Sequence, residues 1–309
     1  MTTRICVVGS SNIDLIAKVP RLPKLGETLV GHSFHLGYGG KGANQAVMSA
    51  RLGAQVVMVT KIGRDVFGEG TLENYRQQGI DSAHVLFDDA RFSGVAPIFV
   101  DDDGRNVIVI VPGANMGLTP DDVRRAQDVI RSAAVLICQL EIPVESTLAA
   151  LRIGRAAGIR TILNPAPAAV LPDDLLALAD YCVPNETEAE LLTGLPVVSI
   201  DEASTAAAAL LDRGSKTVII TLGPRGALVA DRGSVSHYPA VEVPAVDSTG
   251  AGDAFVGSLA VFLAEGVPLP RSVARANAVA ALSVATIGTQ VSFPSRAEAD
   301  TFLRERGLL

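Results

Sequence analysis

Short runs of apolar residues alternate with longer, amphipathic stretches along most of the chain. The apolar runs lie at residues 5–8, 56–62, 135–140, 161–163, 181–183 and 218–222. Short, mainly apolar runs are typical of strands buried on both faces of a parallel sheet, and the stretches between them are long enough for helices. The pattern predicts a single domain over residues 1–309 with a Rossmann-like α/β fold, in which helices cover both faces of a mostly parallel central sheet.

Two segments, approximately residues 13–36 and 93–111, are strand-like but have no helix between their apolar runs. Asp103-Gly104 in the second segment separates two such runs, which is a strong signal for a β-hairpin. We expect the two segments to pair in a small β-sheet outside the main sheet. Because a small sheet leaves an apolar face exposed, we expect it to act as a lid over a ligand, to join two subunits as a homodimer, or both. An edge extension of the main sheet is the alternative.

Charge and cysteine content restrict the class of protein. The 309 residues carry a formal net charge of -7 and no cluster of lysine or arginine, which argues against a nucleic-acid surface. Cys6, Cys138 and Cys182 lie in apolar runs without a Cys-x-x-Cys pair, as buried thiols in a reducing compartment would. The N-terminus lacks a signal-peptide core, and no apolar stretch reaches the ~18 residues of a membrane span. We therefore expect a cytoplasmic protein without membrane or nucleic-acid partners.

Residues 247–253 read Asp-Ser-Thr-Gly-Ala-Gly-Asp and lead into an apolar run, residues 254–263, that indicates a buried helix. The first amides of a helix have no partner within it and carry the positive end of its dipole, so a phosphate fits against Gly250, Ala251 and Gly252. Asp253 would face this phosphate, where a carboxylate is useful if it accepts the proton of an attacking hydroxyl. The plainer alternative is that Asp253 only favours the helix N-terminus.

Residues 37–42 read Gly-Tyr-Gly-Gly-Lys-Gly and match the fingerprint of dinucleotide-binding folds. A nicotinamide-dependent oxidoreductase is therefore an alternative of a different class. Against it, the fingerprint belongs after a buried parallel strand, whereas residues 31–36 alternate polar and apolar as a half-exposed strand does. Lys41 also brings a long side chain to a turn where the backbone must approach a pyrophosphate. The remaining interpretation is a glycine turn that admits a polar ligand, with Lys41 and Asn44 as donors.

Residues 39–46, Gly-Gly-Lys-Gly-Ala-Asn-Gln-Ala, and residues 247–253 together resemble the two signature sequences of the ribokinase-like carbohydrate kinases. The resemblance extends over essentially the whole chain. It implies the fold of that family and an ATP-dependent kinase that phosphorylates the primary 5-hydroxyl of a small sugar, with D-ribose the first candidate. Deoxyribose, fructose, another small sugar or a nucleoside is the alternative substrate. A sugar-binding module without catalysis is disfavoured because Asp253 is present.

The resemblance also implies a role for individual residues in the sugar site. Asp253 is the base that activates the sugar hydroxyl, and the amides of Gly250, Ala251 and Gly252 form an anion hole. At a helix terminus, Asp253 is expected to stay ionised and to be a weak base. The implied sugar-binding residues are Asn12, Asp14, Gly40, Lys41, Asn44, Glu141 and Asp253, with Ala96 and Ile98 from the lid.

Three cofactors follow from the same resemblance: ATP, Mg²⁺ and the monovalent cation K⁺. The implied nucleotide-binding residues are Asn185, Glu188, Thr221, Gly223 and Asn277, of which Glu188 helps to hold Mg²⁺ through water. A capping box is the alternative for Asn185 and Glu188, which are three residues apart. The implied K⁺ ligands are Asp247, Thr249, Ser283, Thr286, Gly288 and Ser292, most of them through backbone oxygens.

Overall fold

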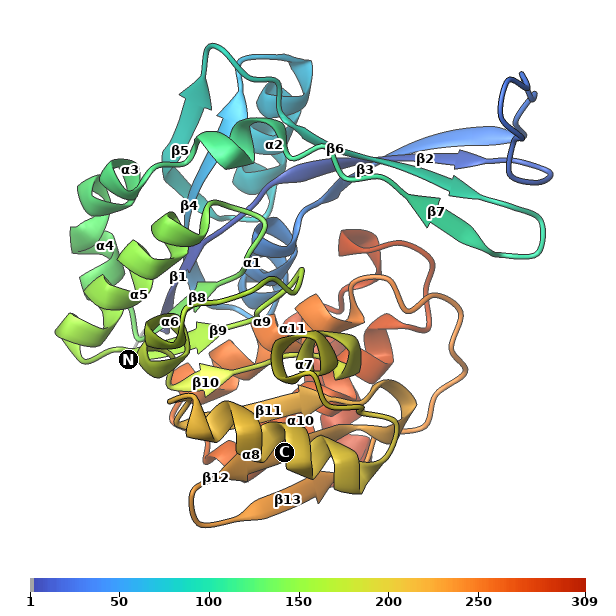
Figure 1. The fold of residues 1–309 in the computed structure, drawn as a ribbon. Coiled ribbons are helices and arrows are strands. Elements are labelled where there is room, and N and C mark those ends of the chain that lie inside the picture. Colours follow the sequence, from blue (N-terminus) through green and yellow to red (C-terminus); the bar gives the residue numbers. More distant parts are fainter. Residues whose placement is uncertain (1–2) are drawn as a thin grey trace.

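A nine-stranded sheet lies at the centre of the computed structural model, which describes residues 3–309 (Figure 1). In the order β13-β12-β11-β10-β9-β8-β1-β4-β5, its strands are Val235–Tyr238, Ala227–Asp231, Thr217–Thr221, Tyr181–Cys182, Arg160–Leu163, Val135–Cys138, Arg4–Val8, Gln55–Gly63 and Asp81–Asp88. Neighbouring strands are parallel except at the β11–β12 and β12–β13 pairs. The predicted mostly parallel sheet is confirmed.

Helices cover both faces of this sheet, because alternate strand residues point to opposite sides. Ile5 and Val7 of β1 belong to one buried apolar cluster, and Cys6 and Val8 belong to the other. The first cluster includes side chains from α1 (Lys41–Arg51), α2 (Val66–Gln77), α9 (Ala251–Ala264), α10 (Leu269–Ser283) and α11 (Arg296–Glu305). The second includes side chains from α3 (Pro120–Arg125), α4 (Gln127–Arg131), α5 (Val144–Ala157), α6 (Asp173–Leu178), α7 (Glu186–Thr193) and α8 (Ile200–Asp212).

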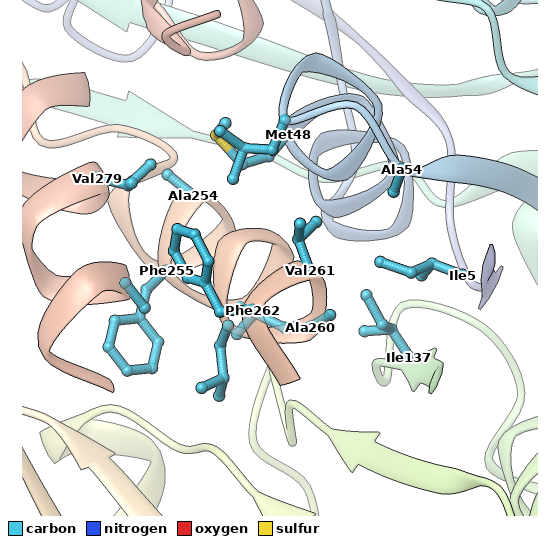
Figure 2. Packing of buried hydrophobic residues seen from close by; sticks show 14 of the residues in the cluster. Ile5, Met48, Ala54, Ile137, Ala254, Phe255, Ala260, Val261, Phe262 and Val279 are labelled. Atoms are coloured by element: carbon cyan, nitrogen blue, oxygen red, sulfur yellow. The ribbon is translucent and has the colours of Figure 1, made fainter. Parts of the chain in front are cut away.

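Helix α9 is buried over nearly its whole length, from Asp253 to Leu263. Figure 2 shows Phe255 and Phe262 of this helix packed among side chains from α1, α10 and the sheet. Full burial of one such aromatic side chain contributes about 1.5–3 kcal/mol to stability. The all-apolar helix predicted after residue 253 is therefore confirmed, and its packing fixes the position of its N-terminus.

A separate four-stranded sheet, here called the small sheet, projects from the side of the molecule (Figure 1). Its strands, in the order β3-β2-β6-β7, are Ser33–Gly39, Asn12–Lys18, Gly94–Val100 and Asn106–Ile108. Asp101 N donates to Arg105 O at 3.0 Å across the predicted hairpin turn. The expected pairing of two distant segments outside the main sheet is confirmed, and the edge extension was wrong.

Within residues 3–309, no helix is long and apolar enough to cross a lipid bilayer.

Candidate active site

The N-terminus of α9 presents free backbone donors. Gly250 caps the helix with φ of 80°, a conformation that favours glycine, and a Cβ there would lie 2.5 Å from the Thr289 methyl group. The first helical bond runs from Ala254 N to Gly250 O at 2.8 Å, and Ala251 N donates to Ser248 O at 3.2 Å. Of the three amides predicted to form the anion hole, those of Gly250 and Gly252 have no backbone acceptor in the described part of the chain, whereas the Ala251 amide is already bonded to Ser248, which corrects that prediction. The amide of Asp253 is also free. With the helix dipole, the free amides form a site suited to an anion.

The side chain of Asp253 is held by two amide groups from α1. Asn44 Nδ2 donates to one carboxylate oxygen at 2.9 Å, and Gln45 Nε2 donates to the other at 2.8 Å. Asp253 is only 7% exposed, and burial raises its pKa despite the opposing effects of Lys41 and these two hydrogen bonds. The expectation of a weak base at a helix terminus needs correction, because burial makes this carboxylate more basic than an exposed helix-terminal aspartate.

The charged groups near Asp253 are one lysine, Lys41, and three further acidic side chains. Lys41 is the first residue of α1, which begins after Gly40, a residue with φ of 87°. Burial lowers the pKa of Lys41, but Asp253, Glu141 and Glu188 outweigh it and raise that pKa overall. Burial and the negative charges of Glu141 and Asp253 raise the pKa of Asp14 to about 7. The site thus combines one positively charged side chain with several carboxylates, and the negative charge of each carboxylate favours protonation of its neighbours.

Two buried residues outside the predicted set orient the sugar-site residues. Asn115 Nδ2 donates to Asn12 Oδ1 at 2.8 Å, and Ser10 Oγ donates to Glu141 Oε2 at 2.6 Å. Lys41 N donates to the same Glu141 oxygen at 3.0 Å. Sequence reasoning missed Ser10 and Asn115. Ser10 closely follows the apolar run at residues 5–8, which is a usable signal, whereas Asn115 lies in the turn Gly113–Gly117 and has no such signal.

The small sheet brings its predicted residues to the same face as Asp14. Strand β2 pairs in parallel with β6, so that Asp14 is opposite Ala96 and Ile16 is opposite Ile98. Paired residues point to the same side of a sheet, and every second residue shares that side. Ala96 and Ile98, which are 5% and 9% exposed, therefore lie on the face that carries Asp14.

A cavity of about 600 Å³ lies beside the N-terminus of α9 and contacts four predicted nucleotide residues, Asn185, Thr221, Gly223 and Asn277. A second cavity, of about 150 Å³, is lined by residues that include Lys41, Glu188, Gly252 and Asp253. Asn185, Thr221 and Gly252 line both cavities. The larger cavity has room for a nucleotide, and the smaller one carries the acidic and basic groups.

Asn185 and Glu188 form the capping box that was the alternative for this pair. Glu188 N donates to Asn185 Oδ1 at 2.8 Å, and Asn185 N donates to Glu188 Oε2 at 2.9 Å. Glu188 nevertheless lines the smaller cavity, and burial raises its pKa. Only one of its carboxylate oxygens, Oε2, takes part in the capping box. Asn277 is buried rather than solvated and donates to Tyr238 O at 3.1 Å.

Asp247 connects two of the predicted cation-binding segments. Its carboxylate accepts hydrogen bonds from Thr249 N and Gly288 N, each at 2.9 Å. Burial opposes ionisation of Asp247, but these hydrogen bonds outweigh it and lower its pKa. Val284 O, the carbonyl after Ser283, accepts from Asp247 N at 3.1 Å.

Two further predicted cation ligands are Thr286 and Ser292. Both line a separate groove of about 840 Å³ beside α10 and α11, and Ser292 Oγ donates to Thr289 O at 2.8 Å. Among the side chains that the structure describes, no group of three or more His, Cys, Asp or Glu is arranged for a metal ion. The backbone-oxygen ligands that the resemblance implies stay a prediction.

Comparison with known proteins gives matches along the whole length. The family model for pfkB family carbohydrate kinases matches residues 2–296. Ribokinase from Mus musculus is 45% identical over 94% of this chain and 91% of its own. Deoxyribokinase from Salmonella typhi is 42% identical over 97% of this chain and 98% of its own. The structure of Arabidopsis thaliana ribokinase complexed with ribose and ATP superposes with a TM-score of 0.92 at 32% identity, covering 98% of this chain and 99% of its own.

Proposed function

Because the chain belongs to the pfkB family of carbohydrate kinases, we propose that it is an ATP-dependent sugar kinase that converts D-ribose to D-ribose 5-phosphate. The ribokinases among its relatives, with 39–45% identity over almost the full length, support ribose as the substrate. The similar deoxyribokinase supports 2-deoxyribose as the second candidate. The nicotinamide-dependent alternative fails on the fold, since residues 37–42 run from the end of β3, which pairs antiparallel in the small sheet, into the start of α1.

The observation that carries the proposal is the position of Asp253 beside the free amides of α9 where the two cavities meet. Asp253 takes the proton of the 5-hydroxyl while that oxygen forms a bond to the γ-phosphorus. The bond between the γ-phosphorus and the β,γ-bridging oxygen breaks, and ADP leaves. The amides of Gly252 and Asp253 stabilise the charge on the transferred phosphoryl group, and Lys41 adds a positive charge.

The sugar contacts follow from the chemistry of the surrounding groups. Asp14 and Glu141 accept hydrogen bonds from sugar hydroxyls, and Asn12 and Lys41 supply donors. Asn44 contributes an amide beside Asp253, and Gly40 lets the backbone approach the sugar. Ala96 and Ile98 cover the sugar from the small sheet. A site built from so many polar groups discriminates strongly against analogues that lack a hydroxyl.

The test is a coupled assay of ADP release over a sugar panel. D-ribose should give the highest kcat/KM, 2-deoxyribose the next, and fructose and a nucleoside much lower values. If no sugar increased ADP release above the rate with ATP alone, the assignment would be wrong. If 2-deoxyribose exceeded D-ribose, the second candidate would replace the first.

The acidic residues near the nucleotide cavity suit a hydrated Mg²⁺. Glu188 lines the smaller cavity with one carboxylate oxygen outside the capping box, and Mg²⁺ keeps several waters when it binds. Bound with ATP, Mg²⁺ would neutralise charge on the β- and γ-phosphates. Glu188 would hold it through water.

The loops joined by Asp247 suit a monovalent cation, and we expect K⁺ to increase kcat. The ion would fix the segment that leads into Gly250 and thereby align the amides of α9, without touching the substrate. The measurement is kcat in K⁺ and in a bulky organic cation at equal ionic strength. Asp247→Asn should weaken the response to K⁺.

Asp231, the last residue of β12, provides a matched control, since its carboxylate also accepts hydrogen bonds from two turn amides, those of Gly233 and Ser234. Asp231→Asn should keep the full response to K⁺. Equal rates in both cations for the unmodified protein would rule out this role of the loops.

The small sheet suits a homodimer, because several of its large apolar side chains are exposed. Ile108 is 48% exposed and lies opposite Ile98 on the face that carries Asp14, and Ile110 is exposed to a similar extent. A second copy of this face would cover both isoleucines. Ile108→Asp is therefore expected to produce monomers and to raise the sugar KM, since a buried unpaired charge is costly and an uncovered sheet is less ordered.

Val107 offers a control on the opposite face of the same strand, where it lies opposite Phe99 and is 43% exposed. Val107→Asp should leave both the dimer and the sugar KM unchanged. Light scattering at micromolar concentration measures the oligomeric state, and a monomeric unmodified protein would contradict the shared-sheet model.

A further inference from the structure

The carboxylate of Asp253 is held by a chain of buried amide side chains, none of which belongs to the predicted sugar or nucleotide site except Asn44. Gln45, on the second turn of α1, donates from Nε2 to Asp253 at 2.8 Å and to Asn164 Oδ1 at 3.0 Å. Gln139 Nε2 donates to Gln45 Oε1 at 2.5 Å. Gln45 and Gln139 are fully buried.

We propose that Gln45 is a positioning residue that fixes the orientation of the Asp253 carboxylate for proton abstraction, and that Gln139 fixes the orientation of Gln45. The inference rests on the proposed role of Asp253 as the base. Gln45 acts through Asp253 and does not itself contact the reacting atoms.

The direction of the hydrogen bonds supports this role. An amide side chain has a donor end and an acceptor end, and rotation by 180° exchanges them. Because Gln139 donates to the oxygen of Gln45, the NH₂ group of Gln45 must face Asp253. Asn164 accepts the second proton of that NH₂ group, and its own Nδ2 donates to Val183 O at 2.8 Å. Each of the two protons of the Gln45 NH₂ group therefore has its own acceptor, which fixes the orientation of the group.

The arrangement of Gln45 and Gln139 includes a destabilising feature that packing alone would not require. Gln139 Oε1 is buried without a hydrogen-bond partner in the described part of the chain. Gly9 makes the space for it, since a Cβ at Gly9 would lie 1.9 Å from Gln139 Oε1. An unsatisfied buried oxygen is destabilising, and such groups in native proteins call for a functional reason. Orientation of Gln45 toward the base provides that reason.

The hydrogen bond from Gln45 also favours the ionised form of Asp253. Burial raises the pKa of Asp253, while Gln45, Asn44 and Lys41 lower it. The other charged groups near Asp253 are Glu141, after β8, Asp14 on β2 and Glu188 on α7, whose negative charges all oppose its ionisation. Loss of the Gln45 donor should therefore move the acid limb of the kcat profile to higher pH.

The test compares Gln45→Leu with the unmodified protein by steady-state kinetics from acidic to alkaline pH. We expect kcat at the plateau to fall about 10- to 100-fold, because a misplaced base loses its alignment with the hydroxyl. The sugar KM should change less than about threefold, since Gln45 does not contact the sugar. The acid limb of kcat should move to higher pH.

Ser49→Ala is the matched control on the same helix. Ser49 Oγ donates to Gln45 O at 2.7 Å and to Gly257 O at 3.1 Å, so it joins α1 to α9 without touching Asp253. It should keep the unmodified pH profile. If Gln45→Leu does not fold, Gln139→Leu tests the same chain one step further from the base, with a smaller loss of kcat and the same direction of pH shift.

Two results would overturn the inference. The first is that Gln45→Leu leaves both kcat and the acid limb of its pH profile unchanged. The second is that Gln45→Leu and Ser49→Ala lose kcat equally and both keep the acid limb of the unmodified protein. The second result would mean that Gln45 only supports packing. Failure of the proposed function is distinguishable, since in that case the unmodified protein would phosphorylate no sugar at all.

Discussion

Asp253→Asn is expected to lower kcat by at least about 10²-fold, because the amide cannot accept the proton of the sugar hydroxyl. Asp253 lines the smaller cavity and is the acidic residue in the first turn of α9. Sugar and nucleotide dissociation constants should change far less than kcat, since most contacts to both ligands come from other residues. Single-turnover kinetics and calorimetric titration of the variant measure the two effects separately.

The hydrogen bonds around Asp253 call for a second variant. Both carboxylate oxygens accept from amide NH₂ groups, of Asn44 and Gln45, so an asparagine at this position would place its own NH₂ group against one of them. Asp253→Ala removes the carboxylate without that conflict and should lose kcat to at least the same extent. Retention of more than about a tenth of kcat by both variants would exclude Asp253 as the base.

Asp14→Ala is expected to raise the sugar KM by about 10- to 150-fold and to leave the KM for ATP nearly unchanged. The sugar hydroxyls lose a charged acceptor, whose hydrogen bonds contribute about 1.5–3 kcal/mol. Asp14 lies on β2 of the small sheet, away from the residues that line the nucleotide cavity. Initial-rate measurements with each substrate varied in turn give both constants. Equal increases in the two KM values would show that Asp14 has a structural role.

The pH dependence of the sugar KM offers a further check of Asp14. Its pKa is raised to about 7 by burial and by the charges of Glu141 and Asp253, so part of the free protein carries a neutral Asp14 at neutral pH. The ionised form accepts hydrogen bonds from the sugar better than the neutral form does. The sugar KM of the unmodified protein should therefore fall as the pH rises through 7, whereas that of Asp14→Ala should not show this change.

Much of the main sheet followed from the sequence because its central strands are buried on both faces. Apolar runs such as residues 5–8 and 218–220 are typical of such strands. Strand β5 lacked that signal, since most residues of Asp81–Asp88 are exposed or only partly buried at the edge of the sheet. The short antiparallel strands β12 and β13 at the opposite edge were missed as well. Edge strands have one neighbour and leave a weaker pattern in the sequence.

The glycine-rich motifs made it possible to predict that the residues of the proposed site lie together. The hydrogen bonds that orient their side chains could not be predicted. Asn44 and Asp253 are 209 residues apart and meet because α1 packs against α9. Neither the periodicity of α1 nor its composition shows that Gln45 turns its NH₂ group toward Asp253. That orientation depends on Gln139, in a segment after a different strand. The raised pKa of Asp253 likewise results from burial by elements distant in sequence.

The identity of the product tests the central claim most directly. The protein should convert D-ribose and ATP to ADP and one phosphorylated sugar, in equal amounts. A phosphorus–proton correlation spectrum of that sugar should link the phosphate to the two protons on C5, as transfer to the primary hydroxyl requires. Hydrolysis of ATP without a phosphorylated sugar, or a phosphate bound to C1, would contradict the proposed function.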